Sequence, residues 1–214
     1  MTRPKSFVIQ IVGGSFLLIV LVALVIGELW TTPRGSDEPF LQRLQRYGSA
    51  PAFSLTERSG KSVASNDLRG KVWIADFIYT RCQDTCPVQT SVMARLQSEF
   101  AADRDLQLVS ITVDPLTDSP EVLSQYADRH GAHRDRWAFL TGDPAEIKRI
   151  AQEGFRLSAV PVTSETQNPV VFHSSRFILI DQKGAIRGYY DSNDPAAVER
   201  LRATAKALLT QKGV

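Results

Sequence analysis

The stretch KVWIADFIYTRCQDTCPVQT, residues 71–90, holds the only two cysteines of this 214-residue chain. Its first ten residues form a nearly continuous apolar run, which is typical of a strand buried on both faces of a sheet. Cys82 comes just after the run, and Cys86 precedes Pro87 at the predicted first turn of a helix. In α/β folds, ligand sites lie outside the carboxyl end of such a strand, so we expect the chemistry of this chain there.

The rest of the domain alternates strands with helices, as judged from the spacing of apolar residues. A hairpin is predicted with its turn at Ser59 and Gly60, and a closing hairpin with its turn at Lys183 and Gly184. This order indicates an α/β sandwich with a mixed central sheet. Further strands are predicted at 106–114, 137–142, 176–182 and 185–191, and helices at 88–102, 119–131, 143–154 and 194–209.

The run FVIQIVGGSFLLIVLVALVIG, residues 7–27, has no charged side chain. As a helix it would be about 31 Å long, which matches a hydrocarbon core about 30 Å thick. It is longer than the apolar run of a signal peptide, and no convincing A-x-A cleavage site follows, so we expect an uncleaved transmembrane anchor. Arg3 and Lys5 precede it, so the positive-inside rule places the tail, residues 1–6, in the cytoplasm.

The compartment follows from this orientation. We expect a single-pass protein of a bacterial inner membrane, with a linker at 28–49 and one C-terminal domain, residues 50–214, in the periplasm. The periplasm is oxidising, so two cysteines there need a partner, a metal or protection. After the anchor, 23 of the 25 Lys and Arg residues remain, equal to the 23 Asp and Glu. This neutral domain gives no electrostatic reason to expect a nucleic-acid partner.

The C-x-x-x-C spacing leaves a static disulfide, a redox couple and a pair of metal ligands open. A helix N-terminus lowers the pKa of a thiol, so we expect both sulfurs to be reactive. On a helix, Cys82 and Cys86 would bring their Cβ atoms within about 5–6 Å. One soft metal ion could then bridge both thiolates, and a disulfide would also be within reach.

A third ligand would decide between these interpretations, and His173 is the candidate because it lies just before a predicted strand. If that strand neighbours the one at 71–80, the imidazole reaches the thiolate pair. Two thiolates and an imidazole suit copper, Cu(I) especially, and zinc is also chemically suitable. A hydrogen-bonded core histidine explains His173 equally well. His130 and His133 are expected at the surface, and Met93 is expected to pack rather than ligate.

Four stretches carry a family resemblance: FIYTRCQDTCP (77–87), VSITVDPLTDSPEVLSQYA (109–127), WAFLTGDPAEI (137–147) and HSSRFILIDQKGAIRGYYD (173–191). Together they resemble the Sco/SenC family of membrane-anchored, thioredoxin-like copper proteins, over about residues 50–209. The resemblance implies a thioredoxin-like mixed sheet flanked by helices. It also implies a copper metallochaperone that helps assemble the CuA centre of cytochrome c oxidase.

Residue by residue, the resemblance implies that copper, as Cu(I) or Cu(II), is held by Cys82, Cys86 and His173. Asp114 and Asp84 match acidic residues of the family that would lie in the second shell of the metal. Asp114 equally suits a turn before proline, and Asp84 would favour the helix N-terminus electrostatically. The implied acceptor is the CuA-bearing subunit of cytochrome c oxidase, served by a periplasmic copper donor or thiol reductant.

The alternative function is that of an enzyme, a thiol–disulfide oxidoreductase. In this hypothesis Cys82 or Cys86 attacks as a thiolate and reduces the cysteines of the CuA-site apo-protein or of another periplasmic target. The three-residue loop between the cysteines, in place of the two-residue loop of C-x-x-C, counts against efficient general exchange.

Overall fold

The computed structural model describes residues 45–82, 85–157 and 174–210. Contacts divide the chain into two units, Met1–Pro39 and Phe40–Val214, and the described residues all belong to the second. The predicted anchor at 7–27 therefore lies outside the described residues. Within the described ranges, no helix is long and apolar enough to cross a membrane.

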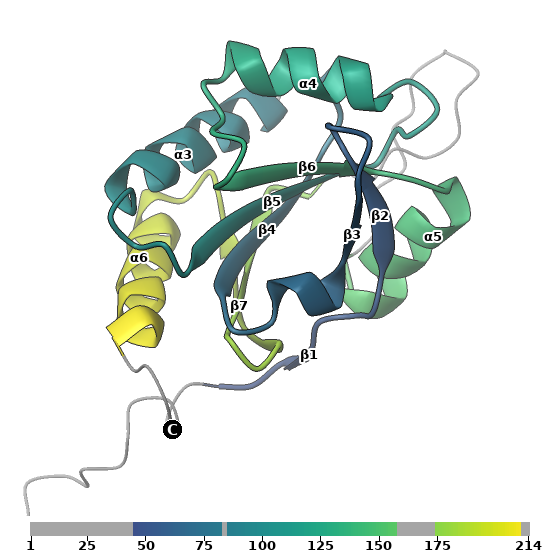
Figure 1. Ribbon diagram of the computed structural model, residues 1–214. Helices are drawn as coiled ribbons and strands as arrows, with labels where there is room; N and C mark the ends of the chain where they lie inside the picture. The colour runs from purple at the N-terminus through teal and green to yellow at the C-terminus, as the bar shows by residue number, and fades with distance from the viewer. Residues whose placement is uncertain (1–44, 83–84, 158–173, 211–214) are drawn as a thin grey trace, which may run out of the picture. The chain divides into compact units, whose positions relative to one another are not determined.

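One eight-stranded mixed sheet forms the middle of the described unit, in the order β1-β8-β7-β4-β5-β6-β2-β3 (Figure 1). Its centre, β4, β5 and β6, is parallel, while β7, β8, β1, β2 and β3 pair with their neighbours in antiparallel fashion. The strands are β1 (Gly48–Ser49), β2 (Ser54–Glu57), β3 (Ser62–Ala64), β4 (Val72–Ile78), β5 (Leu106–Thr112), β6 (Trp137–Thr141), β7 (Arg176–Ile180) and β8 (Ala185–Asp191). The predicted mixed sheet is confirmed.

Helices cover both faces of this sheet, and the alternation of side chains along β4 explains why (Figure 1). Ile74 and Ile78 belong to the core beneath α3, α4 and α6, whereas Trp73 and Phe77 belong to the core beneath α5 and η2. All seven residues of β4 are buried, as a strand between two apolar layers must be. The helices are η1 (Ser65–Leu68), α3 (Thr85–Glu99), α4 (Pro120–Arg129), α5 (Pro144–Arg149), the π-helical η2 (Ile150–Gly154) and α6 (Pro195–Thr210).

Local signals in the sequence correctly place several boundaries. Ser119 caps α4 by accepting a hydrogen bond from the backbone N–H of Val122 at 3.4 Å, and Pro120 is the first helical residue. The closing hairpin turns at Gly184, whose φ of 81° strongly favours glycine. Other boundaries differ: the helix predicted at 88–102 is α3, Thr85–Glu99, which starts three residues earlier. The last two residues of the predicted linker form β1, which pairs with β8 at the edge of the sheet.

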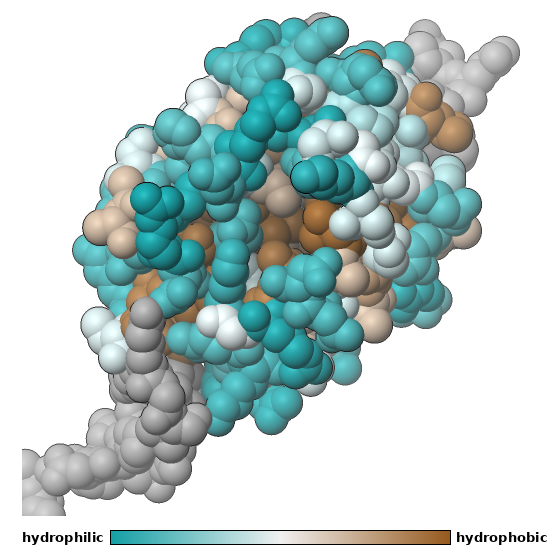
Figure 2. Space-filling view, viewed as in Figure 1, coloured by the Kyte–Doolittle hydropathy of each residue, from teal (hydrophilic) through white to brown (hydrophobic). Residues whose placement is uncertain are grey.

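One face of the described unit is mainly polar. Figure 2 shows a mainly hydrophilic face, with apolar side chains visible in its middle. Among the described residues, the exposed large hydrophobic side chains are Tyr47, Val88 and Leu116. Val88 lies in the first turns of α3, and Leu116 lies between β5 and α4, so both follow the carboxyl ends of parallel strands.

Asp76 is the one charged residue within β4, and it has no solvent exposure. Its Oδ1 accepts a hydrogen bond from Ser110 Oγ at 2.6 Å, and that hydroxyl in turn accepts one from Trp137 Nε1 at 2.9 Å. Its Oδ2 has no hydrogen-bond partner among the described residues. Burial raises the pKa of Asp76 to about 7, because a carboxylate loses its hydration there, and hydrogen bonding by Ser110, by Gln89 and by the backbone offsets only part of the rise.

The raised pKa of Asp76 predicts that the contribution of this residue to the stability of the folded protein falls as the pH rises. Well below its ordinary pKa of 3.8, the carboxyl group is protonated in both the folded and the unfolded chain. Between there and about pH 7 only the unfolded chain releases the proton, so the free energy of unfolding falls by about 1.4 kcal/mol per pH unit. The loss is on the order of 4 kcal/mol once the pH exceeds the folded pKa.

Asp76→Asn keeps the shape of the side chain and removes its charge, so this pH dependence should flatten. Urea unfolding of the reduced, metal-free protein at about pH 4.5 and pH 7 would measure the difference. Cys86 and Tyr126 stay protonated in the folded state over this range, because burial raises the pKa of both. A variant with the same pH slope as the wild type would show that Asp76 is not its source.

Candidate metal centre

The two cysteines lie where the sequence predicts, beyond the carboxyl end of β4 and at the start of α3. The backbone N–H of Cys82 donates to the carbonyl of Tyr79 at 3.2 Å, which turns the chain after the strand. The backbone N–H of Cys86 donates a hydrogen bond to Sγ of Cys82, with 3.5 Å between the nitrogen and the sulfur. The structure contains two thiols rather than a disulfide. The pair is therefore compact enough for both sulfurs to act on one ion.

The expectation that both sulfurs have a lowered pKa is wrong for Cys86. Its side chain is buried at 4% exposure, and burial raises the pKa of the thiol because the thiolate loses its hydration. The neighbouring Cys82 and Asp76 add to the rise, since a second negative charge nearby disfavours the thiolate. Desolvation thus outweighs the helix N-terminus, and the metal-free Cys86 holds its proton at neutral pH.

His173 and Asp84 lie outside the described residues, but one condition for a role of His173 is met. β7 pairs with β4, with Ile178 opposite Ala75 and Ile180 opposite Trp73. Because the two strands are antiparallel, β7 begins at the edge of the sheet where β4 ends. Residue 173 precedes the first residue of β7 by three positions. Within the described part of the chain, no group of three or more His, Cys, Asp or Glu side chains is placed to hold a metal ion.

Asp114 contacts Arg81, the residue that precedes Cys82. Its Oδ2 accepts a hydrogen bond from Arg81 Nη2 at 2.9 Å, within an ion pair, and the same guanidinium group donates to Thr117 Oγ1 at 2.9 Å. The carbonyl of Asp114 also accepts the backbone N–H groups of Thr117 and Asp118, at 3.0 and 2.9 Å. Asp114 is therefore both a turn residue and a partner of the residue that precedes Cys82.

Two buried carboxyl groups near the pair were not singled out from the sequence. Asp76 lies on β4 and contributes to the electrostatics of Cys86. The sequence does show Asp76 as a charged residue inside an otherwise apolar run, and this pattern could have identified it. Asp118 is also fully buried and accepts hydrogen bonds from Thr80 and Thr112. No signal distinguishes Asp118 from an ordinary residue of a turn before a helix.

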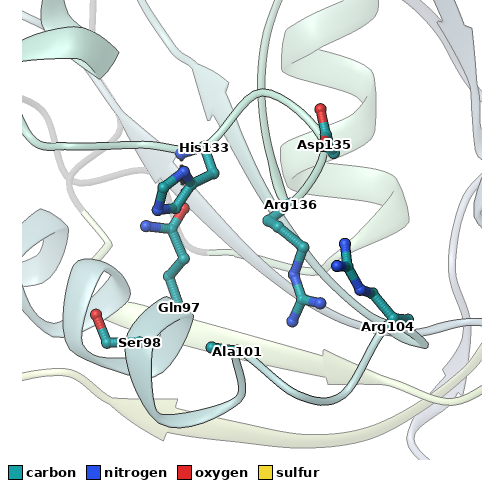
Figure 3. A pocket seen from close by; sticks show the side chains of 7 residues that line it. All are labelled: Gln97, Ser98, Ala101, Arg104, His133, Asp135 and Arg136. Carbon is teal, nitrogen blue, oxygen red and sulfur yellow. Dashed lines mark hydrogen bonds between the residues drawn. The ribbon is translucent and has the colours of Figure 1, made fainter.

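The remaining histidines, His130 and His133, follow the end of α4. His130 is half-buried with its ring 4.6 Å from that of Tyr126, and burial lowers its pKa. His133 is exposed and lines a pocket of about 390 Å³ together with Arg104 and Arg136 (Figure 3). This pocket includes residues from the carboxyl-terminal part of α3, whereas Cys86 is in its first turn.

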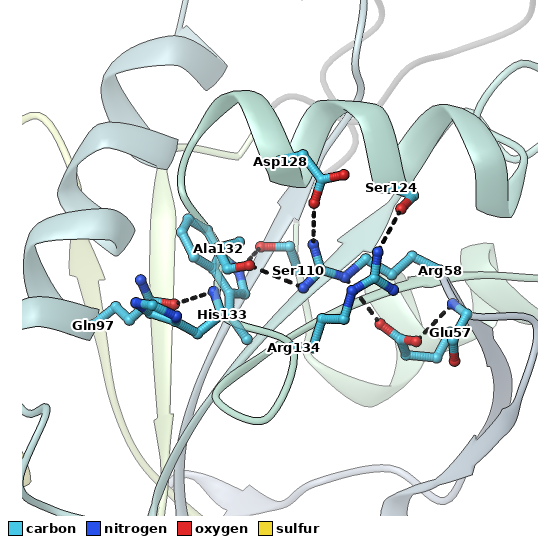
Figure 4. Close-up of polar contacts among 11 residues, drawn as sticks. Glu57, Arg58, Gln97, Ser110, Ser124, Asp128, Ala132, His133 and Arg134 are labelled. Atoms are coloured by element: carbon cyan, nitrogen blue, oxygen red, sulfur yellow. Dashed lines mark hydrogen bonds and ion pairs between the residues drawn. The ribbon is translucent and has the colours of Figure 1, made fainter.

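A buried arginine, Arg58, connects β2 with α4 and the segment that follows α4 (Figure 4). Arg58 forms ion pairs with Glu57 at 3.4 Å and Asp128 at 3.8 Å, and its Nη2 donates to the carbonyl of Ala132 at 3.1 Å. Its guanidinium carbon lies 5.3 Å from the centre of the Phe139 ring. These contacts connect the end of β2 to α4 and β6, so they support the scaffold rather than the cysteine loop.

Known proteins share this architecture. The SCO1/SenC family model matches residues 42–209. The SCO1 protein homolog of Bacillus subtilis is 32% identical over 162 residues, which cover 75% of this chain and 82% of that protein. BsSco, described as having a disulfide switch and as a member of the Sco family of cytochrome c oxidase assembly proteins, matches with a TM-score of 0.69 and 29% identity, over 80% of this chain and 99% of its own.

Copper is present in another similar structure. ScoI of Arabidopsis thaliana with copper bound matches with a TM-score of 0.63 and 26% identity, over 75% of this chain and 98% of its own. The mixed sheet flanked by helices is consistent with the thioredoxin-like fold of Sco proteins. With a family model that spans most of its length and a dithiol at the end of its central strand, the chain belongs to the SCO1/SenC family.

Proposed function

We propose that this chain is a copper-binding metallochaperone that helps assemble the CuA centre of cytochrome c oxidase. The observation that carries the proposal is the pair of thiols at the junction of β4 and α3, with the backbone N–H of Cys86 3.5 Å from the sulfur of Cys82. Copper-bound ScoI of Arabidopsis thaliana and the oxidase assembly family of BsSco support it. In this proposal Cys82, Cys86 and His173 hold the ion.

The chemistry of the donors favours Cu(I), because soft thiolates and imidazole suit a soft ion, and they also accommodate Cu(II). The ion displaces the proton that Cys86 retains in the metal-free protein, so binding releases protons. The sulfur-bearing residues are only 8% and 4% exposed, at Cys82 and Cys86 respectively. Copper therefore passes on by ligand exchange once an acceptor docks against the loop, rather than by escape into water.

The proposal also includes the membrane anchor, the compartment and the partners of the domain. An anchor at residues 7–27 would hold the chain in a bacterial inner membrane with its copper domain in the periplasm. The acceptor is the CuA-bearing subunit of the oxidase, and a periplasmic copper donor or thiol reductant serves the chain. Asp84, inside the cysteine loop, would contribute negative charge near the bound cation.

Thiol–disulfide exchange is the second candidate function, favoured by the closeness of the two cysteines and by the disulfide switch of BsSco. In this reaction the two thiols of the chain become a disulfide, while two electrons and two protons reduce a disulfide of the target to two thiols. Cys82 or Cys86 makes the first attack as a thiolate, and desolvation of Cys86 opposes thiolate formation on that residue.

Removing a proposed ligand should weaken copper binding. Cys82→Ser and Cys86→Ser should each abolish tight Cu(I) binding, because a hydroxyl is a poor ligand for a soft ion. His173→Ala should weaken it and alter the visible thiolate-to-copper band of the Cu(II) form. Competition with a Cu(I) chelator and absorption spectroscopy would measure both effects.

The matched control for His173→Ala is His133→Ala, because His133 is exposed and lines a pocket at the other end of α3. The control should bind copper like the wild type. If His173→Ala also kept the wild-type affinity and spectrum, the histidine would not be a ligand, and the site would consist of the two thiolates with another donor.

Deletion of the gene should lower cytochrome c oxidase activity in the native host. If the chain delivers copper, excess copper in the medium should restore the activity, because mass action then replaces the chaperone. If the chain acts as a reductant, copper should fail and a membrane-permeant thiol should restore the activity. Oxidase activity that is unaffected by the deletion would overturn both functions.

A further inference from the structure

We propose that Asp118 is a positioning residue that fixes Cys82 relative to Cys86. The inference rests on the proposed function, in that it explains how the two copper-binding thiols keep their geometry. Asp118 lies between β5 and α4, 36 positions from Cys82 along the chain, and it acts through Thr80. It does not touch the metal in this proposal.

Every oxygen of the Asp118 carboxylate is engaged. Oδ1 accepts a hydrogen bond from Thr80 Oγ1 at 2.5 Å, and Oδ2 accepts one from the backbone N–H of Thr80 at 3.1 Å. Oδ2 also accepts a hydrogen bond from Thr112 Oγ1 at 2.5 Å. The side chain is fully buried, so no water competes for these bonds. One carboxylate therefore ties the end of β4 to the end of β5.

The position of Thr80 makes this contact important for the cysteines. Thr80 is two residues before Cys82, and it leaves β4 just where the chain turns toward the pair. Cys86 has a separate support, because it lies in the first turn of α3 and packs in the core beneath that helix. Cys82 packs in the same core, and its backbone N–H donates to the carbonyl of Tyr79. The Asp118 contact adds a tertiary anchor at Thr80, inside this turn, that comes from a distant segment of the chain.

Another link between the same two loops, the ion pair of Arg81 and Asp114, is weaker. Arg81 pairs with Asp114 at 2.9 Å, but 61% of its side chain is exposed, so water and salt screen this pair. The Asp118 bonds involve a charged acceptor in a dry environment, where hydrogen bonds are stronger. We therefore assign the positioning role to Asp118, although Asp114 contacts the residue adjacent to Cys82.

The choice of a carboxylate follows from the number of donors. Three donors converge on the side chain, and a carboxylate has acceptors only, so both oxygens are used without conflict. Asparagine retains one oxygen, which can still accept from the backbone of Thr80, and its amide group can donate to the Thr80 hydroxyl. Alanine has no side-chain acceptor, so all three hydrogen bonds are lost. The expected order of damage is Asp118→Ala first and Asp118→Asn second.

A buried aspartate at the opposite edge of the sheet provides the matched control. Asp181 is 3% exposed and accepts hydrogen bonds from the backbone N–H groups of Lys183 and Ala185 and from Arg187 Nε. Its turn lies beside Gly70, which precedes β4, whereas Cys82 follows β4. Asp181→Ala should lower the stability of the protein without moving the cysteines.

The test compares Asp118→Ala, Asp118→Asn and Asp181→Ala in the full-length chain. Two quantities are measured below the unfolding transition: Cu(I) affinity by chelator competition, and the alkylation rate of Cys82 in the reduced, metal-free protein, identified by mass spectrometry. Asp118→Ala should weaken Cu(I) binding by about 10- to 100-fold, the usual cost of losing an outer-shell support. It should also accelerate alkylation, because the loop of Cys82 opens more often. Asp118→Asn should lie between Asp118→Ala and the wild type.

Asp181→Ala should keep wild-type values of both quantities. If Asp118→Ala and Asp181→Ala changed them equally, Asp118 would be a stability residue only, and the inference would be wrong. A wild-type protein that binds no Cu(I) would overturn the proposed function, while the alkylation rates would still decide the role of Asp118.

If Asp118→Ala does not fold, Thr80→Val decides the question. Valine keeps the shape of threonine and removes one of the three donors to Asp118. It should produce a smaller change in the same direction, and the double variant Thr80→Val with Asp118→Asn should show less than the sum of the two effects. Additive effects, or an unchanged alkylation rate in Thr80→Val, would contradict the proposed contact.

Discussion

The burial of β4 between two apolar layers is the constraint on which the rest of the structure depends. Its odd and even residues face different cores, so helices must cover both faces of the sheet. With both faces covered, functional groups are accessible only at the ends of the strands. The cysteine pair follows β4 directly and therefore emerges at such an end, where α3 begins. Parallel pairing with β5 brings the β5–α4 loop to the same edge of the sheet.

The two buried aspartates, Asp118 and Asp76, have different effects on the site. Asp118 has three donors for its two oxygens, and it connects two loops at the functional edge. Asp76 loses its hydration on burial and hydrogen bonds compensate only partly, so its pKa is raised. The charge of its carboxylate adds to the raised pKa of Cys86, whose largest cause is the desolvation of the thiol. The same environment that orders the loop also holds the proton on one thiol. A bound cation would reverse that balance, because it stabilises the thiolate directly.

Much of the fold was predictable because its signals are local. The apolar run of β4, the cap at Ser119 and the glycine turns depend on a few neighbouring residues, and the structure confirms them. The thiol pKa of Cys86 was not predictable in this way. The helix N-terminus was visible in the sequence, but the larger opposing effect, desolvation, depends on elements distant in sequence that pack around Cys86. Asp118 was missed for a similar reason, since its hydrogen-bond donors lie on two other segments, the turn after β4 and the end of β5.

The sequence by itself determined the alternation of strands and helices, the place of both cysteines at a strand end and a helix start, and the resemblance to Sco proteins. These properties follow from periodicity, caps and motifs, which are local or directly visible. Only the tertiary structure decided that β7 lies beside β4, that Cys86 is desolvated, and that Asp118 supports the loop of Cys82. Each of these depends on contacts between segments far apart in the chain, whose burial and partners no local pattern specifies.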